Sequence, residues 1–180
     1  FEEEGEGTLI TFEEDEKMEA AVISGIAFNR DEAKITVVGV PDRPGIAYQI
    51  LGPVAEANID VDMIIQNVGV DGTTDFSFTV HRNDYARALR ILEPVKEHIK
   101  ARDVIGGDKI AKVSVVGVGM RSHVGIASKA FRALAEEGIN IQMISTSEIK
   151  ISVVVDEKYM ELAVRVLHKV FELDREPAGV

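Results

Sequence analysis

An internal repeat constrains the fold of this chain more strongly than any other feature of its sequence. Residues 34–40 read KITVVGV and residues 112–118 read KVSVVGV. Further along, NIDVDMIIQN at 58–67 parallels GINIQMISTS at 138–147. In both halves a strand-like segment and then a helical segment follow these matches in the same order. A match of this length predicts two copies of one structural unit.

Hydrophobic periodicity predicts the elements of the first copy. Phe76, Phe78 and Val80 alternate as in a strand, and Asp71-Gly72 before them is typical of a hairpin turn. The predicted elements are a helix at 45–57 and strands at 34–40, 60–67, 74–80 and 102–106. A second helix follows the third strand, and Asn83 or Asp84 is its predicted cap. The side chains predicted to face inward from this helix are Ala88, Leu89, Leu92 and Val95. This order, β-α-β-β-α-β, is the split, ferredoxin-like arrangement of the α+β class.

The second copy lacks its last strand. Its elements run in the order β-α-β-β-α from 110 to about 172, and the charged ending ELDREPAGV does not have a strand pattern. A strand-like segment at 20–29 precedes the first copy and has no role in it. We therefore predict that residues 20–29 complete the second sheet, so that the first unit is nested in the second. The predicted boundaries are 33–106 for this inner unit, 18–30 plus 108–173 for the outer unit, 1–17 for a leading segment and 174–180 for a tail.

Charge and composition exclude several classes of function. The net charge of −11 argues against nucleic-acid binding, which depends on Lys and Arg side chains that neutralise phosphates. The chain has no Cys, which excludes disulfides, a thiolate nucleophile and a zinc–thiolate site. No apolar run reaches the ~18 residues that a membrane helix needs. No membrane partner is expected, and a cytoplasmic location fits.

The segment GVPDRPGIA at 39–47 holds more turn-forming residues than a strand-to-helix connection needs. Asp42 occupies a position typical of a helix cap, Pro44 fits the first helical turn, and Gly45 permits an unusual φ. One interpretation is a capped turn and nothing more. The other is a seat for a free amino acid, because a helix N-terminus attracts a carboxylate and Asp42 can face an ammonium group.

The next strand offers two further polar side chains. Asp62 and Gln66 are four residues apart and are therefore predicted to share one face of the strand. The alternative is that both are exposed positions of a strand and its end. The equivalent turn of the second copy, GVGMRSHVGIA, has Ser122-His123 in place of an Asp, and Met120 there fits packing better than ligand contact.

No residue pattern supports independent catalysis by this chain. The four His residues, at 81, 98, 123 and 168, have no metal-ligand spacing with a partner. The sequence has no phosphate loop of the GxxxxGKS/T or GxGxxG type, and it nominates no nucleophile with a base. We predict a chain that has no catalytic residues, no metal site and no cofactor of its own.

Several segments in combination resemble the tandem ACT regulatory domains of aspartate kinase. They are SGIAFNRDEAKITVVGVPDRPGIA, VDMIIQN, DGTTDFSFTV, KVSVVGVGMRSHVGIA and NIQMISTSEIKISVVV, and the resemblance covers about residues 18–173. The opening FEEEGEGTLI is similar to the tail of the catalytic domain in that family, which makes residues 1–17 a linker. Met18 lies where some members start a separate small subunit.

The resemblance implies a regulatory function. Aspartate kinase uses ATP to convert L-aspartate to 4-phospho-L-aspartate, on the route to lysine (through diaminopimelate), threonine and methionine. Its ACT units bind end-product amino acids and inhibit the kinase, whose ATP and magnesium would bind in a domain that this chain lacks. In the family, sheets of two chains pair side by side and place the first turn of one unit against the second strand of another. A homodimer and an association with the catalytic domain or subunit are therefore implied.

Carried over by motif, the resemblance implies two effector sites. The threonine-like site comprises Asp42, Gly45, Ile46, Ala47, Val61, Asp62, Gln66, Asn140 and Ile141. The lysine-like site comprises Met120, His123, Gly125, Ile126, Thr146 and Ser147. Gly69 departs from the family, because members that lysine and threonine control jointly can carry a serine there. The effector preference of the second site is therefore left open.

Two other functions are compatible with the same residues. The chain could pair subunits as an assembly module without binding an effector. It could also be the ACT pair of another enzyme under amino-acid control. The length and the order of the motifs favour aspartate kinase.

Overall fold

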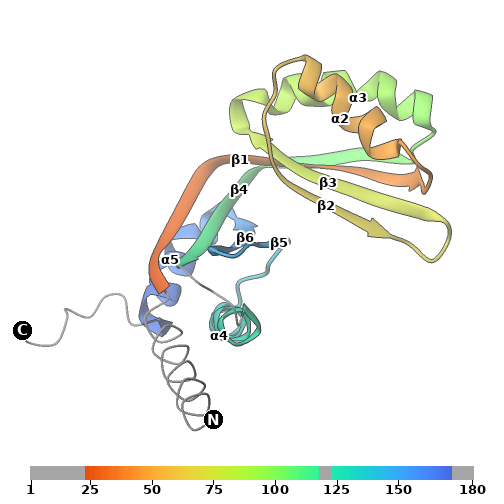
Figure 1. The fold of residues 1–180 in the computed structure, drawn as a ribbon. Helices are drawn as coiled ribbons and strands as arrows, with labels where there is room; N and C mark the ends of the chain where they lie inside the picture. Colours follow the sequence, from red (N-terminus) through yellow and green to blue (C-terminus); the bar gives the residue numbers. More distant parts are fainter. Residues whose placement is uncertain (1–22, 118–122, 172–180) are drawn as a thin grey trace, which may run out of the picture. The chain divides into compact units, whose positions relative to one another are not determined.

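The computed structural model describes residues 23–117 and 123–171 (Figure 1). The elements of the first half are β1 (Ile23–Pro41), α2 (Ile46–Glu56), β2 (Val61–Val68), β3 (Thr73–His81), a 3-10 turn at Arg82–Asp84 and α3 (Tyr85–Ile99). Those of the second half are β4 (Asp103–Gly117), α4 (His123–Glu136), β5 (Met143–Thr146), β6 (Lys150–Asp156), a 3-10 turn at Glu157–Tyr159 and α5 (Met160–Val170). Among the described helices, none has both the length and the apolar character needed to cross a membrane.

The strands form an antiparallel sheet in the order β2-β3-β1-β4-β6-β5. Contacts divide the chain into an inner unit, Asn29–Ala111, and an outer unit made of the described residues on both sides of it. In the outer unit the Ser24 hydroxyl donates to the Val116 carbonyl oxygen at 3.1 Å, which ties the start of β1 to the end of β4. The predicted fold class, two ferredoxin-like units with the first nested in the second, is confirmed.

Both β1 and β4 are continuous strands, which corrects one expectation from the sequence. We expected each to be two strands, with breaks near residues 30–33 and 107–109. In the structure β1 runs for 19 residues and β4 for 15. Ala33, at the expected break in β1, is fully buried and pairs with Val80 in the ladder with β3. Burial and pairing hold the backbone extended there, although a polar Arg-Asp-Glu run precedes this alanine.

The core of the inner unit lies between its strands and the pair of helices α2 and α3, which cover one face of the sheet (Figure 1). Phe76 and Phe78 are buried, as their alternation predicts, and their ring centroids are 6.2 Å apart in a tilted arrangement. A buried Phe side chain contributes about 1.5–3 kcal/mol of transfer free energy. From the helices Ile50, Val54, Ala88 and Leu92 complete this core, while Leu89 and Val95 are partly buried.

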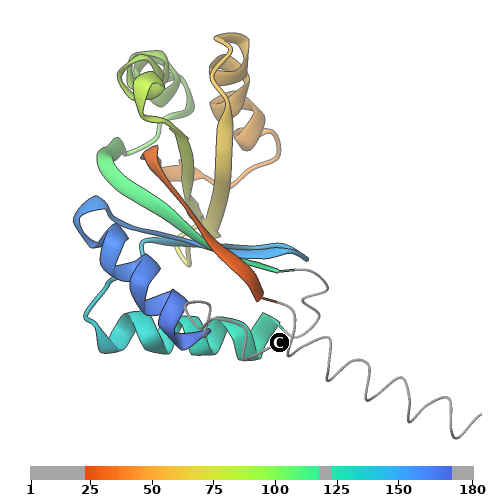
Figure 2. The same cartoon turned by 90° about the vertical axis from the view of Figure 1, so that its left-hand side faces the viewer.

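The outer unit repeats this plan with β5, β6 and the adjacent parts of β1 and β4. Helices α4 and α5 lie side by side, and they are drawn in cyan-green and blue in Figure 2. Its buried residues come from both strands and helices, and the largest fully buried side chains are Leu134, Ile151, Met160 and Leu167.

Equivalent details in the two units confirm the internal repeat. The Thr36 and Ser77 hydroxyls are 2.8 Å apart in the inner unit, and those of Ser114 and Ser152 are 2.7 Å apart in the outer unit. Both α2 and α4 are followed by a residue with positive φ, at Asn58 (57°) and at Gly138 (69°). A left-handed residue after a helix lets the last carbonyl groups find donors.

The hydroxyl pairs also shift the alignment of the second strands by one residue. From the sequence we expected residues 150–156 to match 74–80. Ser152 corresponds to Ser77, so they match 75–81 instead. Asp156 then corresponds to His81, and their side chains have the same role, because each accepts a hydrogen bond from the backbone N–H two residues later, at 3.1 Å. Asp84 does occupy the N-cap position of α3, as one of the two predicted caps, but its side chain makes no capping hydrogen bond, and the capping bond comes from His81 at the 3-10 turn.

Candidate functional site

The Pro-Asp-Arg-Pro-Gly segment forms a β-turn that places the start of α2. The Ile46 N–H donates to the Arg43 carbonyl oxygen at 3.3 Å, and Gly45 has φ 88° and ψ −4°. These values and Pro44 in the preceding position define a type II turn, in which only Gly or Asn readily occupies the third place. Gly45 is thus the N-cap of α2, and Asp42 does not cap the helix, contrary to one interpretation of the sequence. Pro44 also lies before the helix and not in its first turn.

The first turn of α2 presents free donors at this position. The N–H groups of Ala47 and Tyr48 donate to no acceptor among the described residues, because the turn bond uses Ile46 and the first helical bond uses Gln49. Free N–H groups and the positive end of the helix dipole attract an anion. Asp42 is exposed three residues before the N-cap, so a carboxylate acceptor and N–H donors lie on one short segment.

The β2–β3 hairpin supports the turn. The Asp42 N–H donates to the Gly72 carbonyl oxygen at 3.1 Å. In the hairpin Asp71 Oδ1 accepts from the Thr73 hydroxyl at 2.7 Å and from the Thr73 N–H at 3.1 Å, and Arg102 lies 3.9 Å from its other oxygen. These hydrogen bonds, with a smaller contribution from Arg102, hold the pKa of Asp71 below its usual value.

Gly69 has little room for a side chain in this hairpin. A Cβ atom there would lie 2.9 Å from Asp71 Oδ1 and 2.9 Å from the Thr73 carbonyl oxygen. The Gly69 N–H donates to that same carbonyl oxygen at 2.7 Å. A serine at position 69 would therefore require this tight loop to change.

A β-bulge also shapes the end of β1, and sequence reasoning missed it. Gly39 has φ 63°, its N–H donates to Asp75 Oδ1 at 2.9 Å, and the register with β3 shifts between Val37 and Val40. A Cβ atom at Gly39 would lie 2.9 Å from the Arg102 Cβ. The available signal was a glycine near the end of an otherwise apolar strand.

Strand β2 carries an irregularity in its pairing with β3 next to Asp62. Val61 pairs with Val80 but Ile64 pairs with Phe78, so β2 has one extra residue between these pairs. Residues two apart share a face, which places Gln66 with Ile64. Asp62, Ile64 and Gln66 are all exposed, whereas Val61, Met63 and Ile65 are more buried, so a shared face for Asp62 and Gln66 stays a prediction.

The predicted residues of the inner unit lie at two ends of its sheet. Asp42 follows Pro41, which pairs with Thr73, whereas Asp62 lies beside Thr79. Thr73 and Thr79 are six residues apart along β3, which corresponds to a distance of about 20 Å between them. One free amino acid is much shorter, so it cannot contact both Asp42 and Asp62 within a single inner unit. Gln66 lies between these two ends, and the half-buried Val61 lies next to Asp62.

The predicted residues of the outer unit have a different local structure. Gly125 is the third residue of α4, whereas its counterpart Gly45 is a left-handed N-cap before α2. Ile126 is partly buried against Ile151. Met120 lies outside the described residues, and His123 is the first residue of α4.

The remaining predicted residues lie on both sides of β5. Asn140 is exposed and Ile141 is half-buried in the connection from α4. Thr146 ends β5, and Ser147 begins the tight connection to β6, where its N–H donates to the Lys150 carbonyl oxygen at 2.8 Å. The Ile149 N–H donates to the Ser147 hydroxyl at 3.4 Å.

Comparisons with known proteins identify the repeated unit. Residues 34–98 and residues 113–171 each match a family model described as an ACT domain. An aspartate kinase of Stutzerimonas stutzeri is 66% identical over 177 residues, which are 98% of this chain and 43% of that protein. An aspartokinase of Pseudomonas aeruginosa is 67% identical over 173 residues, which are 96% of this chain and 42% of that protein.

Two solved structures contain chains that this chain matches over nearly their whole length. A structure of aspartokinase alpha and beta subunits contains a chain 66% identical, with a TM-score of 0.79, which aligns over 83% of this chain and 99% of its own length. The chain belongs to the aspartate kinase family. The ligand-free regulatory subunit of aspartate kinase from Thermus thermophilus is 44% identical, with a TM-score of 0.77 and the same coverage.

As a member of the aspartate kinase family, the chain is the regulatory portion of a transferase and consists of ACT domains over its matched length. It spans less than half the length of the curated aspartate kinases that it matches. The recognised family is confirmed.

Proposed function

We propose that this chain senses an amino acid and transmits feedback inhibition to an aspartate kinase catalytic domain or subunit. That enzyme would form 4-phospho-L-aspartate from L-aspartate and ATP, with magnesium in the catalytic part. The expected effectors are threonine, lysine or both, as end products of the pathway. The observation that carries this proposal is the start of α2, where the Asp42 carboxylate and the free N–H groups of Ala47 and Tyr48 lie within one segment of seven residues.

The start of α2 suits the two charges that every free amino acid carries. The N–H groups of Ala47 and Tyr48 can donate to a carboxylate, and Asp42 can accept from an ammonium group. The Gly45 turn leaves space for a ligand, since a Cβ atom built there would meet nothing within 4 Å. Ile46 is buried beneath this surface and anchors the helix to the core.

We infer that a second ACT unit completes the site. Asp42 and Asp62 of one inner unit are too far apart to contact the same amino acid. The strand residues that contact the ligand at the turn must therefore come from a neighbouring unit. Asn140 and Ile141 are the residues expected from an outer unit. In a homodimer with ACT sheets side by side, the edge strand β2 is available for such pairing, because it pairs only with β3 among the described residues.

The outer unit is expected to provide a second, distinct site. Its first turn would use Met120, His123, Gly125 and Ile126, with Thr146 and Ser147 from the strand end. Because Gly125 lies inside α4, this unit does not repeat the Gly45 turn. We therefore propose that the two sites differ in effector, with lysine expected at the outer one.

Calorimetry on the purified chain tests the sensing function. Threonine or lysine should give saturable heat, whereas L-aspartate, the substrate of the catalytic part, should give none. Asp42→Ala should weaken threonine binding about tenfold or more, because an ammonium group would lose a charged acceptor. Its melting temperature without ligand should stay within about 1–2 °C of the parent value, since Asp42 is exposed.

A control variant separates binding from folding. Glu93→Ala removes an exposed carboxylate from α3, away from the turn, and should leave the affinity unchanged. A folded chain that binds neither threonine nor lysine would refute the sensing function. Equal affinity in Asp42→Ala and the parent would refute the proposed role of Asp42.

The second candidate function is an assembly module that pairs subunits without an effector. Exposed apolar side chains along β2 and its hairpin favour it, with Ile64 52% and Val68 60% exposed. This function predicts self-association that threonine and lysine do not change. Sedimentation velocity with and without each amino acid distinguishes it from sensing.

A further inference from the structure

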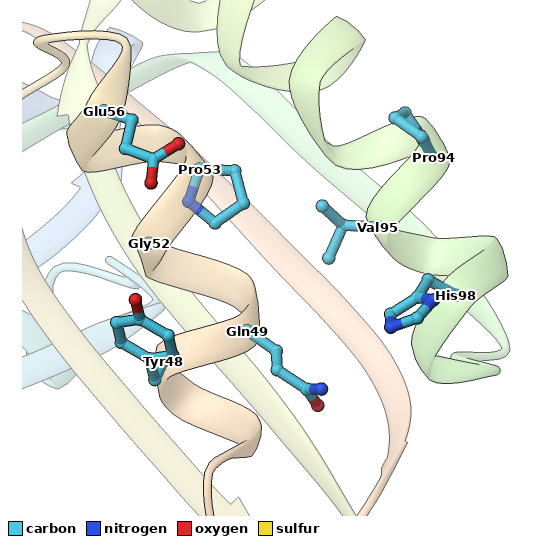
Figure 3. Close-up of a pocket in the computed structure, with 8 residues that line it drawn as sticks. All are labelled: Tyr48, Gln49, Gly52, Pro53, Glu56, Pro94, Val95 and His98. Atoms are coloured by element: carbon cyan, nitrogen blue, oxygen red, sulfur yellow. The ribbon is translucent and has the colours of Figure 1, made fainter.

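A cleft lies between α2 and α3 (Figure 3). It is a cleft of about 350 Å³, within the size range of small-molecule sites. From α2 it is lined by Tyr48, Gln49, Gly52, Pro53 and Glu56. Val95 and His98 of α3 point toward Gln49 and Pro53 of α2 across the cleft, and Pro94 borders it (Figure 3). The cleft lies wholly within the inner unit.

Three residues that disfavour helices line this one cleft. Pro53 lies inside α2 and Pro94 inside α3, and Gly52 precedes Pro53. Relative to Ala, an interior Gly costs about 1 kcal/mol and an interior Pro about 3 kcal/mol. Helix stability alone therefore does not account for these residue types, and sequences depart from local preference most often at functional sites.

The outer unit shows that the fold does not need these residues. The repeat aligns Gly52 with Arg132, Pro53 with Ala133 and Pro94 with Lys169. It also aligns Gln49 with Lys129, so that the outer unit carries two cations where the inner unit has an amide and a glycine. The composition of the cleft is thus specific to the inner unit.

The polar groups of the cleft are rich in acceptors. Gln49 Oε1 is shielded from solvent and has no hydrogen-bond donor among the described residues. The Gln49 carbonyl oxygen lacks its usual helical donor, because Pro53 has no N–H. The Glu56 carboxylate forms no ion pair within the described part of the chain. An unpartnered buried acceptor is unfavourable, and a donor from a ligand removes that penalty.

We propose that this cleft binds a small organic cation, a primary alkylammonium compound. The ammonium group donates to Gln49, while the alkyl chain lies against Pro53 and Val95. Glu56 lies two helical turns further along α2 and adds negative charge at the other end of the cleft. The exposed ring of Tyr48, at the rim, can add a cation–π contact. A net charge of −11 also favours cations over anions near the surface. This site is separate from the amino-acid site proposed at the start of α2.

The test uses the isotope-labelled full chain and n-butylammonium chloride as the probe, followed by two-dimensional NMR of backbone amides. We expect saturable shifts at Gln49, Gly52 and His98, with a Kd of about 1–10 mM, as suits a ligand of so few atoms. n-Butanol, which has the same chain without the charge, should bind at least about tenfold more weakly. Sodium chloride at equal ionic strength provides the reference spectrum.

Matched variants locate the site. Gly52→Leu should abolish the shifts by filling the cleft, whereas Gly52→Ala should retain binding, because its Cβ would meet only Tyr48 ring atoms at 3.7 Å or more. Gln49→Leu should weaken binding about tenfold, and Asp42→Ala should leave it unchanged, which separates this site from the amino-acid site. Non-saturating shifts, equal binding of n-butanol, or unchanged binding in Gln49→Leu would each overturn the proposal.

Discussion

At the scale of single residues, backbone geometry accounts for residue types such as Gly45, and side-chain hydrogen bonds account for others such as His81. The sequence alone identified Gly45 as a residue that permits an unusual φ, and the structure shows φ 88° there. It could not show that the aligned Gly125 is helical, because the same three letters, Gly-Ile-Ala, follow different turns. The role of His81 was also hidden, since a histidine that accepts from a backbone N–H has no signature in sequence.

The two aligned glycines should respond in opposite ways to the same substitution. Gly45→Ala should lower the free energy of unfolding by about 1–2 kcal/mol, because a Cβ is unfavourable at positive φ. Gly125→Ala should raise it by up to about 1 kcal/mol, because alanine favours the helix interior. Urea denaturation of both variants measures the difference, and a loss of stability in both would contradict the assignment of α4.

Tyr85 should make stability depend on pH in the alkaline range. Burial, and then the charge of Asp108, raise the pKa of this phenol above its usual value of about 10. The unfolded chain therefore loses the phenol proton first, so this residue lowers stability progressively as pH rises above about 10. Urea midpoints measured between neutral pH and pH ~11 should fall more in the parent than in Tyr85→Phe. Parallel curves would show that Tyr85 does not contribute.

At the scale of elements, the repeat and the periodicities predicted most of what forms. The helix at 45–57 and the strand at 60–67 are observed at Ile46–Glu56 and Val61–Val68. The continuity of β1 and β4 was not predictable, because Arg30, Asp31, Asp108 and Lys109 between their halves are polar and exposed, so no hydrophobic pattern marks them as strand. The extra residue in β2 was likewise invisible, since it exists only relative to the partner strand β3.

The caps before α3 and α5 provide a prediction at this scale. His81→Ala should lower stability by about 1 kcal/mol, because the Asn83 N–H loses its acceptor. His81→Asp should restore most of that loss, because Asp156 makes the same bond in the outer unit. Thermal unfolding of the three proteins measures the effect. Equal losses in His81→Ala and His81→Asp would mean that His81 acts through packing instead.

At the scale of the whole molecule, sequence patterns identified the family but could not assemble the site. Asp42 and Asp62 were both candidates by motif, yet their separation along the sheet is a property of strand register. The proposed site needs a neighbouring ACT unit, and the sequence of one chain does not identify the surfaces through which two units contact each other. Edge strands are the best physical guide, because unpaired backbone groups favour further strand pairing.

Self-association should depend on the exposed apolar side chains of β2. Val68→Glu should weaken the homodimer about tenfold or more, because it places a charge in an apolar contact between edge strands. Ala86→Glu, which adds the same charge to an exposed position on α3, away from the turn and from β2, should have little effect. Sedimentation equilibrium over a range of concentrations compares the two. An unchanged dimer in Val68→Glu would exclude this edge as the interface.

The division of β1 between two units also has a consequence for synthesis on the ribosome. The first residues of β1 belong to the outer unit and emerge before the 83 residues of the inner unit, Asn29–Ala111. At ~5–20 residues per second, about 4–17 s pass before their partners in β4 begin to appear. The inner unit can close on itself as it emerges, whereas the outer unit can form only after the inner one has been made. The order of folding is thus set by the direction of translation.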